Sequence, residues 1–247
     1  MSAIINLGAA ATAAQSRRAL PGRAARAKLD KLRRIKQAAR KLFGQRGFEA
    51  TTTREIAAEA DIGAGTLFLY AGSKEDLLVM IFCDEIGRAT DRAFATLPPR
   101  ALLDQILHVF RAIIALHAAS PALAKVFVKE LPFVGDDRHG MADFMTSLYA
   151  RLEQLIDRAA LAGELKPGLP AAALAHNIFA IYFQALQRWL SAKSPSTAFH
   201  EAALRDSIEL QLCGLRNRSV KSAKGIGAAT RSRRSAKFSP ISQGATN

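Results

Sequence analysis

Cysteine is scarce in this chain: its 247 residues include only Cys83 and Cys213, and no CxxC pair occurs. This count excludes a disulfide framework. We expect both thiols to act as small apolar side chains in a reducing compartment, which predicts a cytoplasmic protein. Aromatic residues make up only 7% of the chain, whereas alanine is abundant, and this balance favours helices over sheets.

Acidic residues are absent from both ends of the chain. Residues 1–29 hold five basic residues, residues 217–247 hold seven, and neither segment holds an acid. The two ends therefore carry +12 of the net charge of +14, and the body is nearly neutral. Basic tails favour polyanions, of which nucleic acid is the commonest. Solvated ends that aid solubility are an equal alternative, and neither interpretation sets sequence specificity.

Long apolar runs and targeting signals are also missing. A secretory signal has basic residues before its apolar segment, and no basic residue precedes the mildly apolar start of this chain. The most membrane-like stretch, Ala171–Leu186, is too short and is interrupted by His176, Asn177 and Gln184. We expect a soluble intracellular protein that has no membrane partner.

Signatures of the common enzyme classes do not occur. The sequence contains no GxGxxG, no GxxxxGKS or GxxxxGKT, no GxSxG and no HExxH. His108 and His117 are nine residues apart, which places them on opposite faces of a helix, so they cannot bind one metal ion together. We therefore predict that the protein is not an enzyme and has no cofactor and no metal site.

The feature that is present almost everywhere is helical periodicity. Apolar residues recur at spacings of three and four, and this pattern predicts an all-α fold. We expect helices at about 28–46, 53–60, 64–70, 74–97, 101–119, 121–131, 138–163, 171–191 and 198–215. Residues 1–25 and 217–247 lack the pattern, and we interpret them as a disordered basic arm and a disordered basic tail.

The second and third of these helices form a predicted helix-turn-helix. Thr52 and Glu55 match a capping box, so a helix should start at Thr53. A turn at 61–63 then leads to a second short helix that begins at Ala64. The apolar positions expected to hold the two helices at their crossing angle are Ile56, Ala57, Ile62 and Leu67.

Many positions around this motif fit one known pattern without gaps, over about residues 31–80. They are Ala38-Ala39, Leu42-Phe43, Gly47-Phe48, Thr52-Thr53, Ile56-Ala57, Ala60, Gly65-Thr66-Leu67-Phe68, Tyr70, Ser73-Lys74-Glu75 and Leu77. The run resembles the N-terminal domain of TetR-family transcriptional regulators. The resemblance implies a DNA-binding domain at 26–74 and a helical effector-binding and dimerisation domain at 75–216. It also implies a homodimer on double-stranded operator DNA, acting as a repressor that a small molecule releases.

The same resemblance assigns residues to DNA. The implied contacts are Thr53, Arg54, Ala64, Gly65, Thr66, Leu69, Tyr70 and Lys74. Hydroxyl and ammonium groups suit phosphate oxygens, and Arg54 can reach a phosphate or a base edge. We interpret Thr52 as a helix cap, and Phe68 as packed between helices rather than inserted into DNA.

Two departures from the family pattern affect this surface. Asp61 stands where glycine is common, which predicts a less relaxed turn. Ala64 and Gly65 open the recognition helix, and neither can make the bidentate contacts that discriminate bases. We expect modest base readout, with Arg54, thymine-methyl contacts, groove shape and the basic segment 17–28 carrying more of the specificity.

The C-terminal half carries two further expectations from the resemblance. A four-helix dimer interface would use the last two helices, with ordinary intrachain core as the alternative; its residues would be Ile178, Ile181, Trp189, Leu204, Ile208 and Leu212. A pocket for an apolar or aromatic effector would be walled by Phe110, Phe127, Phe144, Phe179 and Phe183, with Phe133 and Tyr182 as further candidates.

The competing function is a non-specific nucleic-acid or architectural protein that binds through its basic tails. Such a protein would bind DNA with strong salt dependence and without operator preference.

Overall fold

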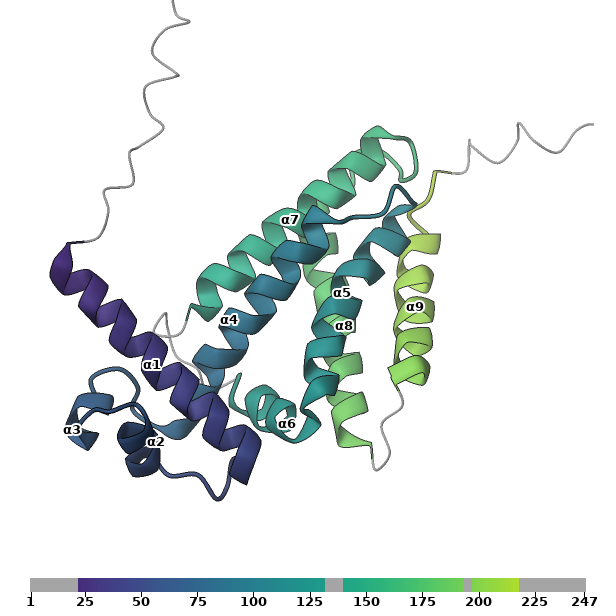
Figure 1. The fold of residues 1–247 in the computed structure, drawn as a ribbon. Helices are drawn as coiled ribbons and strands as arrows, with labels where there is room; N and C mark the ends of the chain where they lie inside the picture. The colour runs from purple at the N-terminus through teal and green to yellow at the C-terminus, as the bar shows by residue number, and fades with distance from the viewer. Residues whose placement is uncertain (1–21, 132–139, 193–196, 218–247) are drawn as a thin grey trace, which may run out of the picture.

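The computed structural model describes residues 22–131, 140–192 and 197–217, and these ranges are almost entirely helical (Figure 1). The helices are α1 (Arg23–Arg46), α2 (Thr53–Glu59), α3 (Ala64–Leu67), α4 (Lys74–Ala95), α5 (Leu102–Ala119), α6 (Pro121–Glu130), α7 (Met141–Leu161), α8 (Ala171–Ser191) and α9 (Thr197–Cys213). The only β-type pairing within these ranges is an isolated bridge between Leu165 and Arg216. The predicted all-α class is confirmed.

The first helix is longer than its apolar pattern predicts. It begins at Arg23 instead of about residue 28, so residues 23–25 are helical and the predicted disordered arm is wrong there. Alanine and arginine are strong helix formers, and they extend the helix beyond the part that packs on the core. Gly47 ends α1 with φ 83° and an extended ψ of 165°, which lies outside the left-handed helical region. Phe48 does fold back, with its ring 5.1 Å from that of Phe43.

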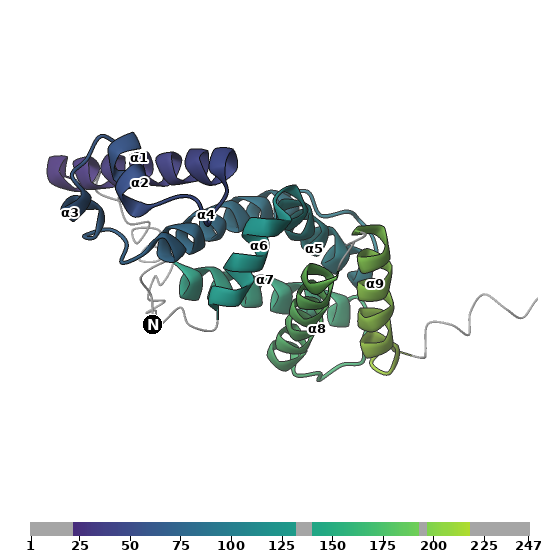
Figure 2. The same ribbon diagram turned by 90° about the horizontal axis from the view of Figure 1, so that it is seen from below.

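Helix α4 connects the two halves of the molecule. Figure 2 shows α1, α2 and α3 at one end, α5 to α9 at the other, and α4 running between them. All seven residues from Leu77 to Cys83 are buried, so this part of α4 is apolar on every side. A helix that is apolar all round must be enclosed, and here α1 packs on one side while α5, α6 and α7 pack on the others.

Helix α5 is the core helix of the second half. Among the described residues it is the one helix long and apolar enough to cross a membrane by length and composition. Our prediction that Ala171–Leu186 is the most membrane-like stretch is therefore wrong. Nine residues of α5 are buried, including Ile106, Phe110 and Ile114, and α4, α6, α7 and α9 all pack against it.

Helices α8 and α9 do not present the predicted dimer residues at the surface. Five of the six are buried within a single chain, with exposed fractions between 0% for Ile178 and 6% for Trp189. These five belong to the protomer's own core, where α8 packs on α7 and α9, and α9 packs on α5, so the intrachain alternative is correct for them. Only Ile181 is partly exposed.

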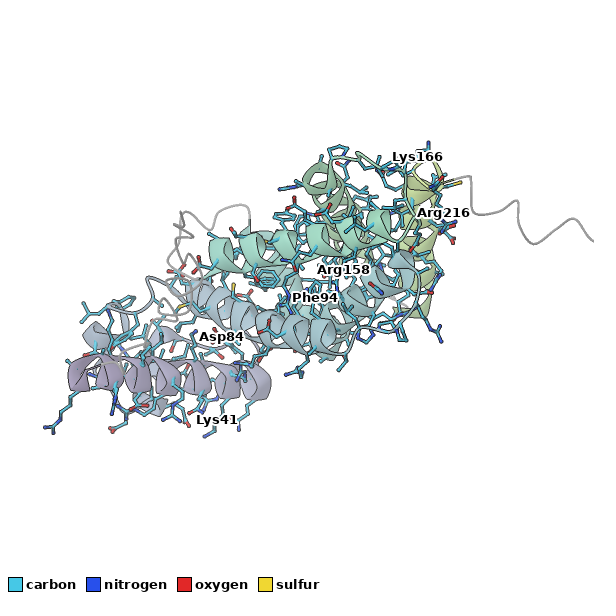
Figure 3. All side chains as sticks on the ribbon, turned by 90° about the horizontal axis from the view of Figure 1, so that it is seen from above. Lys41, Asp84, Phe94, Arg158, Lys166 and Arg216 are labelled. Carbon is cyan, nitrogen blue, oxygen red and sulfur yellow. The ribbon has the colours of Figure 1, made fainter. Side chains whose placement is uncertain are left out.

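The end of the described chain is fastened to the α7–α8 connection. The Lys166 amide donates to the Leu215 carbonyl at 2.9 Å, and the Asn217 amide donates to the Glu164 carbonyl at 3.1 Å. Arg216 donates to both carboxylate oxygens of Glu209, at 2.6 and 2.8 Å. Figure 3 shows Lys166 and Arg216 close together at this end of the bundle.

Candidate functional site

The helix-turn-helix starts at a complete capping box. The Glu55 amide donates to the Thr52 hydroxyl oxygen at 3.2 Å, and the Thr52 amide donates to the Glu55 carboxylate at 2.9 Å. The bonds from Thr52 and the Arg46 guanidinium, 2.7 Å away, lower the pKa of Glu55. The prediction that Thr52 is a helix cap is confirmed, and α2 begins at Thr53 as expected.

The turn between the two short helices holds the one non-glycine residue with positive φ in the described ranges. This residue is Asp61, with φ 53°. Its carboxylate lies 3.6 Å from the Arg34 guanidinium of α1, with the carboxylate almost fully exposed. Aspartate tolerates the left-handed region better than most residues but less well than glycine, so the prediction of a less relaxed turn is confirmed.

The recognition helix is shorter than predicted. Helix α3 covers only Ala64–Leu67, and Phe68 is its C-cap. Gly63 supplies no side-chain cap, so the helix lacks the stabilising bond that a serine would give. Leu67 is fully buried and anchors the helix to the core.

Most predicted DNA residues lie at the surface around α2 and α3. Arg54, Ala64, Gly65 and Leu69 are exposed, and Thr53, Thr66 and Tyr70 are partly exposed. No hydrogen bond or ion pair within the described residues engages the Arg54 guanidinium. This face therefore offers an unpaired cation, hydroxyl groups and a short, nearly side-chain-free edge.

Phe68 is not packed between helices as we predicted. Its side chain is 54% exposed, and the next residue, Leu69, is 81% exposed. Because α3 ends at Leu67, the chain turns away before Phe68 can reach the core. Two large apolar side chains thus lie beside the recognition helix, where they are available for contact with bases or sugars.

Lys74 is held by the protein itself. Its ammonium donates to the backbone carbonyls of Phe48 and Glu49, at 3.0 and 3.3 Å, and lies 4.4 Å from the centre of the Phe48 ring. These bonds join the start of α4 to the connection between α1 and α2. Lys74 is therefore a structural tie in this structure, and its predicted contact with DNA stays a prediction.

Helix α1 carries its free positive charge at its N-terminal end. Arg33, Arg34, Lys36, Arg40, Lys41 and Arg46 each pair with a carboxylate. Arg23, Arg26 and Lys28 are exposed and have no such partner among the described residues. In both Figure 1 and Figure 2 this end of α1 lies on the same side of the molecule as α3.

The second half contains an apolar cavity of about 40 Å³ between α4, α5, α6, α7 and α8. Its walls are Ile86, Ile113, His117, Phe127, Leu131, Met141, Phe144, Met145, Leu148, Phe179, Tyr182, Phe183 and Leu186. Four of the five predicted phenylalanines, Phe127, Phe144, Phe179 and Phe183, line the cavity. The exception, Phe110, is fully buried and stacks behind Tyr182, with ring centres 4.4 Å apart. Phe133 lies outside the described residues.

Residues 35–81 match the family model described as bacterial regulatory proteins, tetR family. These residues form a TetR-type DNA-binding domain, and the chain is a DNA-binding transcriptional regulator.

Three similar proteins extend the comparison beyond the matched domain. The fatty acid metabolism regulator protein of Bacillus subtilis is 24% identical over 77% of this chain and 98% of its own. The repressor KstR of Rhodococcus jostii is 26% identical over 69% of this chain and 78% of its own. The crystal structure of Thermus thermophilus FadR, a TetR-family repressor in complex with lauroyl-CoA, has a TM-score of 0.60 at 24% identity. It is matched over its whole length and over 80% of this chain.

The comparisons settle two predictions. The relatives are DNA-binding transcriptional regulators, so the predictions of a DNA-binding regulator and of a protein that is not an enzyme are confirmed. Regulators of this family bind operator DNA, dimerise and bind small effectors.

In this regulator, α4 touches both the cavity and the DNA-binding half. Ile86 lines the cavity, and the two residues before it, Asp84 and Glu85, pair with α1. The Lys36 ammonium lies 2.7 Å from Asp84, and Arg40 pairs with Glu85. Figure 3 places Asp84 on the side of α4 that faces α1. Helix α4 therefore joins the cavity wall to α1.

Sequence reasoning missed His117, Ile86, Met141 and Met145 as cavity residues. His117 was considered only as a metal ligand, although it follows Ile113 and Phe110 at spacings of four and seven, which puts it on the buried face of α5. That periodicity was the available signal. Nothing in the sequence distinguishes the two methionines and Ile86 from ordinary core residues.

Proposed function

We propose that this regulator represses its target genes as a dimer and leaves the operator when a long apolar acyl compound, in the class of acyl-CoA, occupies the cavity. The observation that carries the proposal is the cavity itself, which is lined almost wholly by apolar and aromatic side chains and touches α4 through Ile86. The lauroyl-CoA bound by Thermus thermophilus FadR supports the choice of ligand class.

The cavity must grow to hold such a ligand. Ligand pockets usually measure 300–1,000 Å³, whereas this one measures about 40 Å³. An acyl chain that enters it has to part the helices around it, including α4. The strain passes to α1 through Lys36 and Arg40, and it alters the position of α3 relative to the second subunit's α3.

We assign the DNA face to the exposed set around α2 and α3. Arg54 carries the direct electrostatic contact, because it is the exposed cation nearest to α3 in sequence and has no competing partner among the described residues. Thr53, Thr66 and Tyr70 bond phosphates, while Ala64, Gly65 and Leu69 approach the bases closely and read methyl groups and shape. Arg23, Arg26 and Lys28 add salt-sensitive attraction.

We assign the dimer surface to the outward faces of α8 and α9, in place of the buried residues named from the sequence. On α8 the exposed stripe is Ala173, Asn177 and Ala180; on α9 it is Ala203, Ser207 and Leu210. Spacings of four and seven put each set on one helix face. Small side chains let two copies of these helices approach closely, and Leu210, 80% exposed, is the apolar anchor.

Footprinting of the purified protein on the DNA upstream of its own gene tests this function. We expect a short palindromic protected site, loss of protection with Arg54→Ala, and unchanged protection with Arg92→Ala, which removes an arginine of α4 far from α3. Protection that spreads without sequence preference would contradict the proposal and favour a non-specific nucleic-acid binder.

A further inference from the structure

The cavity has two polar groups in an otherwise apolar wall. Of the residues that line it, only His117 and Tyr182 carry side-chain nitrogen or oxygen atoms, and none bears a charge at neutral pH. His117 comes from α5 and Tyr182 from α8, so the two groups belong to different walls of one cavity.

The Tyr182 hydroxyl is buried and unpaired. Its side chain is 3% exposed, and its ring lies between Phe110, at 4.4 Å, and Phe179, at 5.8 Å. No described residue accepts or donates a hydrogen bond at the hydroxyl. Burial raises the pKa of Tyr182, so the group stays a neutral O–H donor.

The Nδ1 atom of His117 is also buried and unpaired. The imidazole is 1% exposed and stacks with Phe82 and Phe127, whose ring centres lie 5.8 and 5.9 Å away. Nδ1 has no hydrogen-bond partner among the described residues. Desolvation lowers the pKa of His117 to about 4, so the ring is uncharged at neutral pH.

Two such unpaired groups around one cavity call for an explanation. Buried polar atoms nearly always have a hydrogen-bond partner, because leaving one unpaired is unfavourable. A phenylalanine in place of Tyr182 would fill nearly the same volume without this penalty. A ligand in the cavity would supply the missing partners.

The chemistry of the wall limits what that partner is. A hydroxyl and an imidazole N–H both donate to a neutral oxygen acceptor. No cation lines the cavity to neutralise a carboxylate, and burial of an unpaired charge is strongly unfavourable. An uninterrupted hydrocarbon would leave both polar atoms unpaired.

We propose that Tyr182 and His117 form a carbonyl-recognition site, at which the effector's ester, thioester or ketone oxygen accepts hydrogen bonds from the Tyr182 hydroxyl and from His117 Nδ1–H. The apolar body of the ligand then packs on the remaining walls. This inference rests on the proposed function in one respect, since it takes the molecule that enters this cavity to be the effector.

Two matched ligand pairs test the site by calorimetry or by the shift in thermal unfolding. The first is dodecanoyl-CoA against S-dodecyl-CoA, which has a methylene group in place of the carbonyl. The second is methyl octanoate against methyl octyl ether, the same replacement without CoA. We expect the wild-type protein to bind the carbonyl compound of each pair about five- to tenfold more tightly, as one or two hydrogen bonds would produce.

Variants of Tyr182 and His117 test whether these two residues cause the preference for the carbonyl compound. In Tyr182→Phe the preference should disappear while affinity for the ether and thioether is kept, and the free protein should melt at or above the wild-type temperature. Tyr149→Phe is the control, since this tyrosine on α7 stacks on His176 outside the cavity wall. His117→Phe provides a second variant in which the preference should fall.

The outcomes separate the two proposals. If methyl octanoate is preferred over the ether but neither CoA compound binds, the acyl-CoA assignment fails and the carbonyl site stands. Equal affinity of the wild-type protein for both members of each pair would overturn the site, as would an unchanged preference in Tyr182→Phe or the failure of all four compounds to bind.

Discussion

Two single residues in this regulator are in unfavourable environments or conformations. Asp61 adopts φ 53° in the turn before α3, and His117 is buried as an uncharged base with an unpaired nitrogen. Both sit in elements that position a functional surface, one beside the recognition helix and one in the cavity wall. Substitution of either residue should therefore change the free energy of unfolding by a measurable amount.

Asp61 variants should follow the backbone requirement of the turn. Asp61→Gly should keep the free energy of unfolding within about 0.5 kcal/mol, because glycine adopts positive φ freely. Asp61→Val should lose more than about 1 kcal/mol, since a β-branched residue is disfavoured there. Urea unfolding measures both; a valine variant as stable as the glycine variant would show that the turn does not hold this conformation.

His117 should make the protein sensitive to acid. Its pKa of about 4 in the folded protein lies below that of an exposed imidazole, 6.5. Between these values the unfolded chain binds more protons, so stability falls as the pH decreases from about 6.5 to about 4, by roughly 2–3 kcal/mol. Desolvation lowers the pKa of His200 as well, and its share of the effect should remain in the variant below.

Urea unfolding of wild type and His117→Phe at pH 7 and pH 5 checks this. The variant should lose much less stability on acidification, and His176→Gln, which changes an exposed histidine, should behave like wild type. Equal acid sensitivity in wild type and His117→Phe would contradict the assignment.

At the scale of elements, α4 joins the cavity wall to the DNA-binding half. Its Ile86 faces the cavity, and Asp84 and Glu85 hold α1. The enclosed segment Leu77–Cys83 gives α4 little freedom to bend. We therefore expect a ligand that displaces Ile86 to move α4 as a whole.

Loosening the contact between α4 and α1 should weaken the coupling. In Asp84→Asn/Glu85→Gln the affinity for operator without ligand should change less than about threefold, while the loss of affinity caused by ligand should shrink by about fivefold or more. This range corresponds to a coupling free energy of about 1–2 kcal/mol. DNA titrations with and without dodecanoyl-CoA measure it. Asp91→Asn is the control, because Asp91 pairs with Arg151 of α7 instead; full coupling in the double variant would exclude this route.

Elements with local start and stop signals could be predicted from the sequence. The predicted starts of α4 and α6 agree with the structure: the Ser73 hydroxyl accepts from the Asp76 amide at the start of α4, and Pro121 is the first residue of α6. The end of α3 could not be predicted in this way. No side chain caps this helix, and its last residue depends on how Leu67 is buried in the core. Phe68 was misassigned for the same reason.

Burial against a partner could not be separated from burial within the chain. The apolar faces of α8 and α9 have the same periodicity whether a second copy or helices of the same chain cover them, and Ile178, Leu204 and Ile208 proved to be internal. The aromatic cavity residues were predicted because family resemblance named the region, whereas the roles of His117 and Ile86 needed the fold.

At the scale of the whole molecule, a dimer is required because α3 is only four residues long and reads few bases alone. The N-terminal end of α1 adds positive charge on the same side as α3 (Figure 2). Specificity then depends on the distance between two recognition helices, which the proposed α8–α9 surface would set.

Leu210→Glu should separate the dimer. It puts a charge at the centre of the proposed apolar stripe, so light scattering should show monomers at micromolar concentration and operator affinity should fall by at least a hundredfold. Leu29→Glu is the control, since Leu29 is also exposed but lies on α1; it should stay dimeric. A dimeric Leu210→Glu protein would place the interface elsewhere.

The most direct test of the account is the affinity for a labelled operator duplex, measured by fluorescence anisotropy with and without dodecanoyl-CoA. We compare wild type with Met145→Trp, which fills the cavity from α7. Wild type should lose at least tenfold in operator affinity when the ligand is added, and Met145→Trp should bind operator normally and ignore the ligand. Ligand that binds the wild-type protein without changing its operator affinity, or that releases Met145→Trp equally well, would contradict the account.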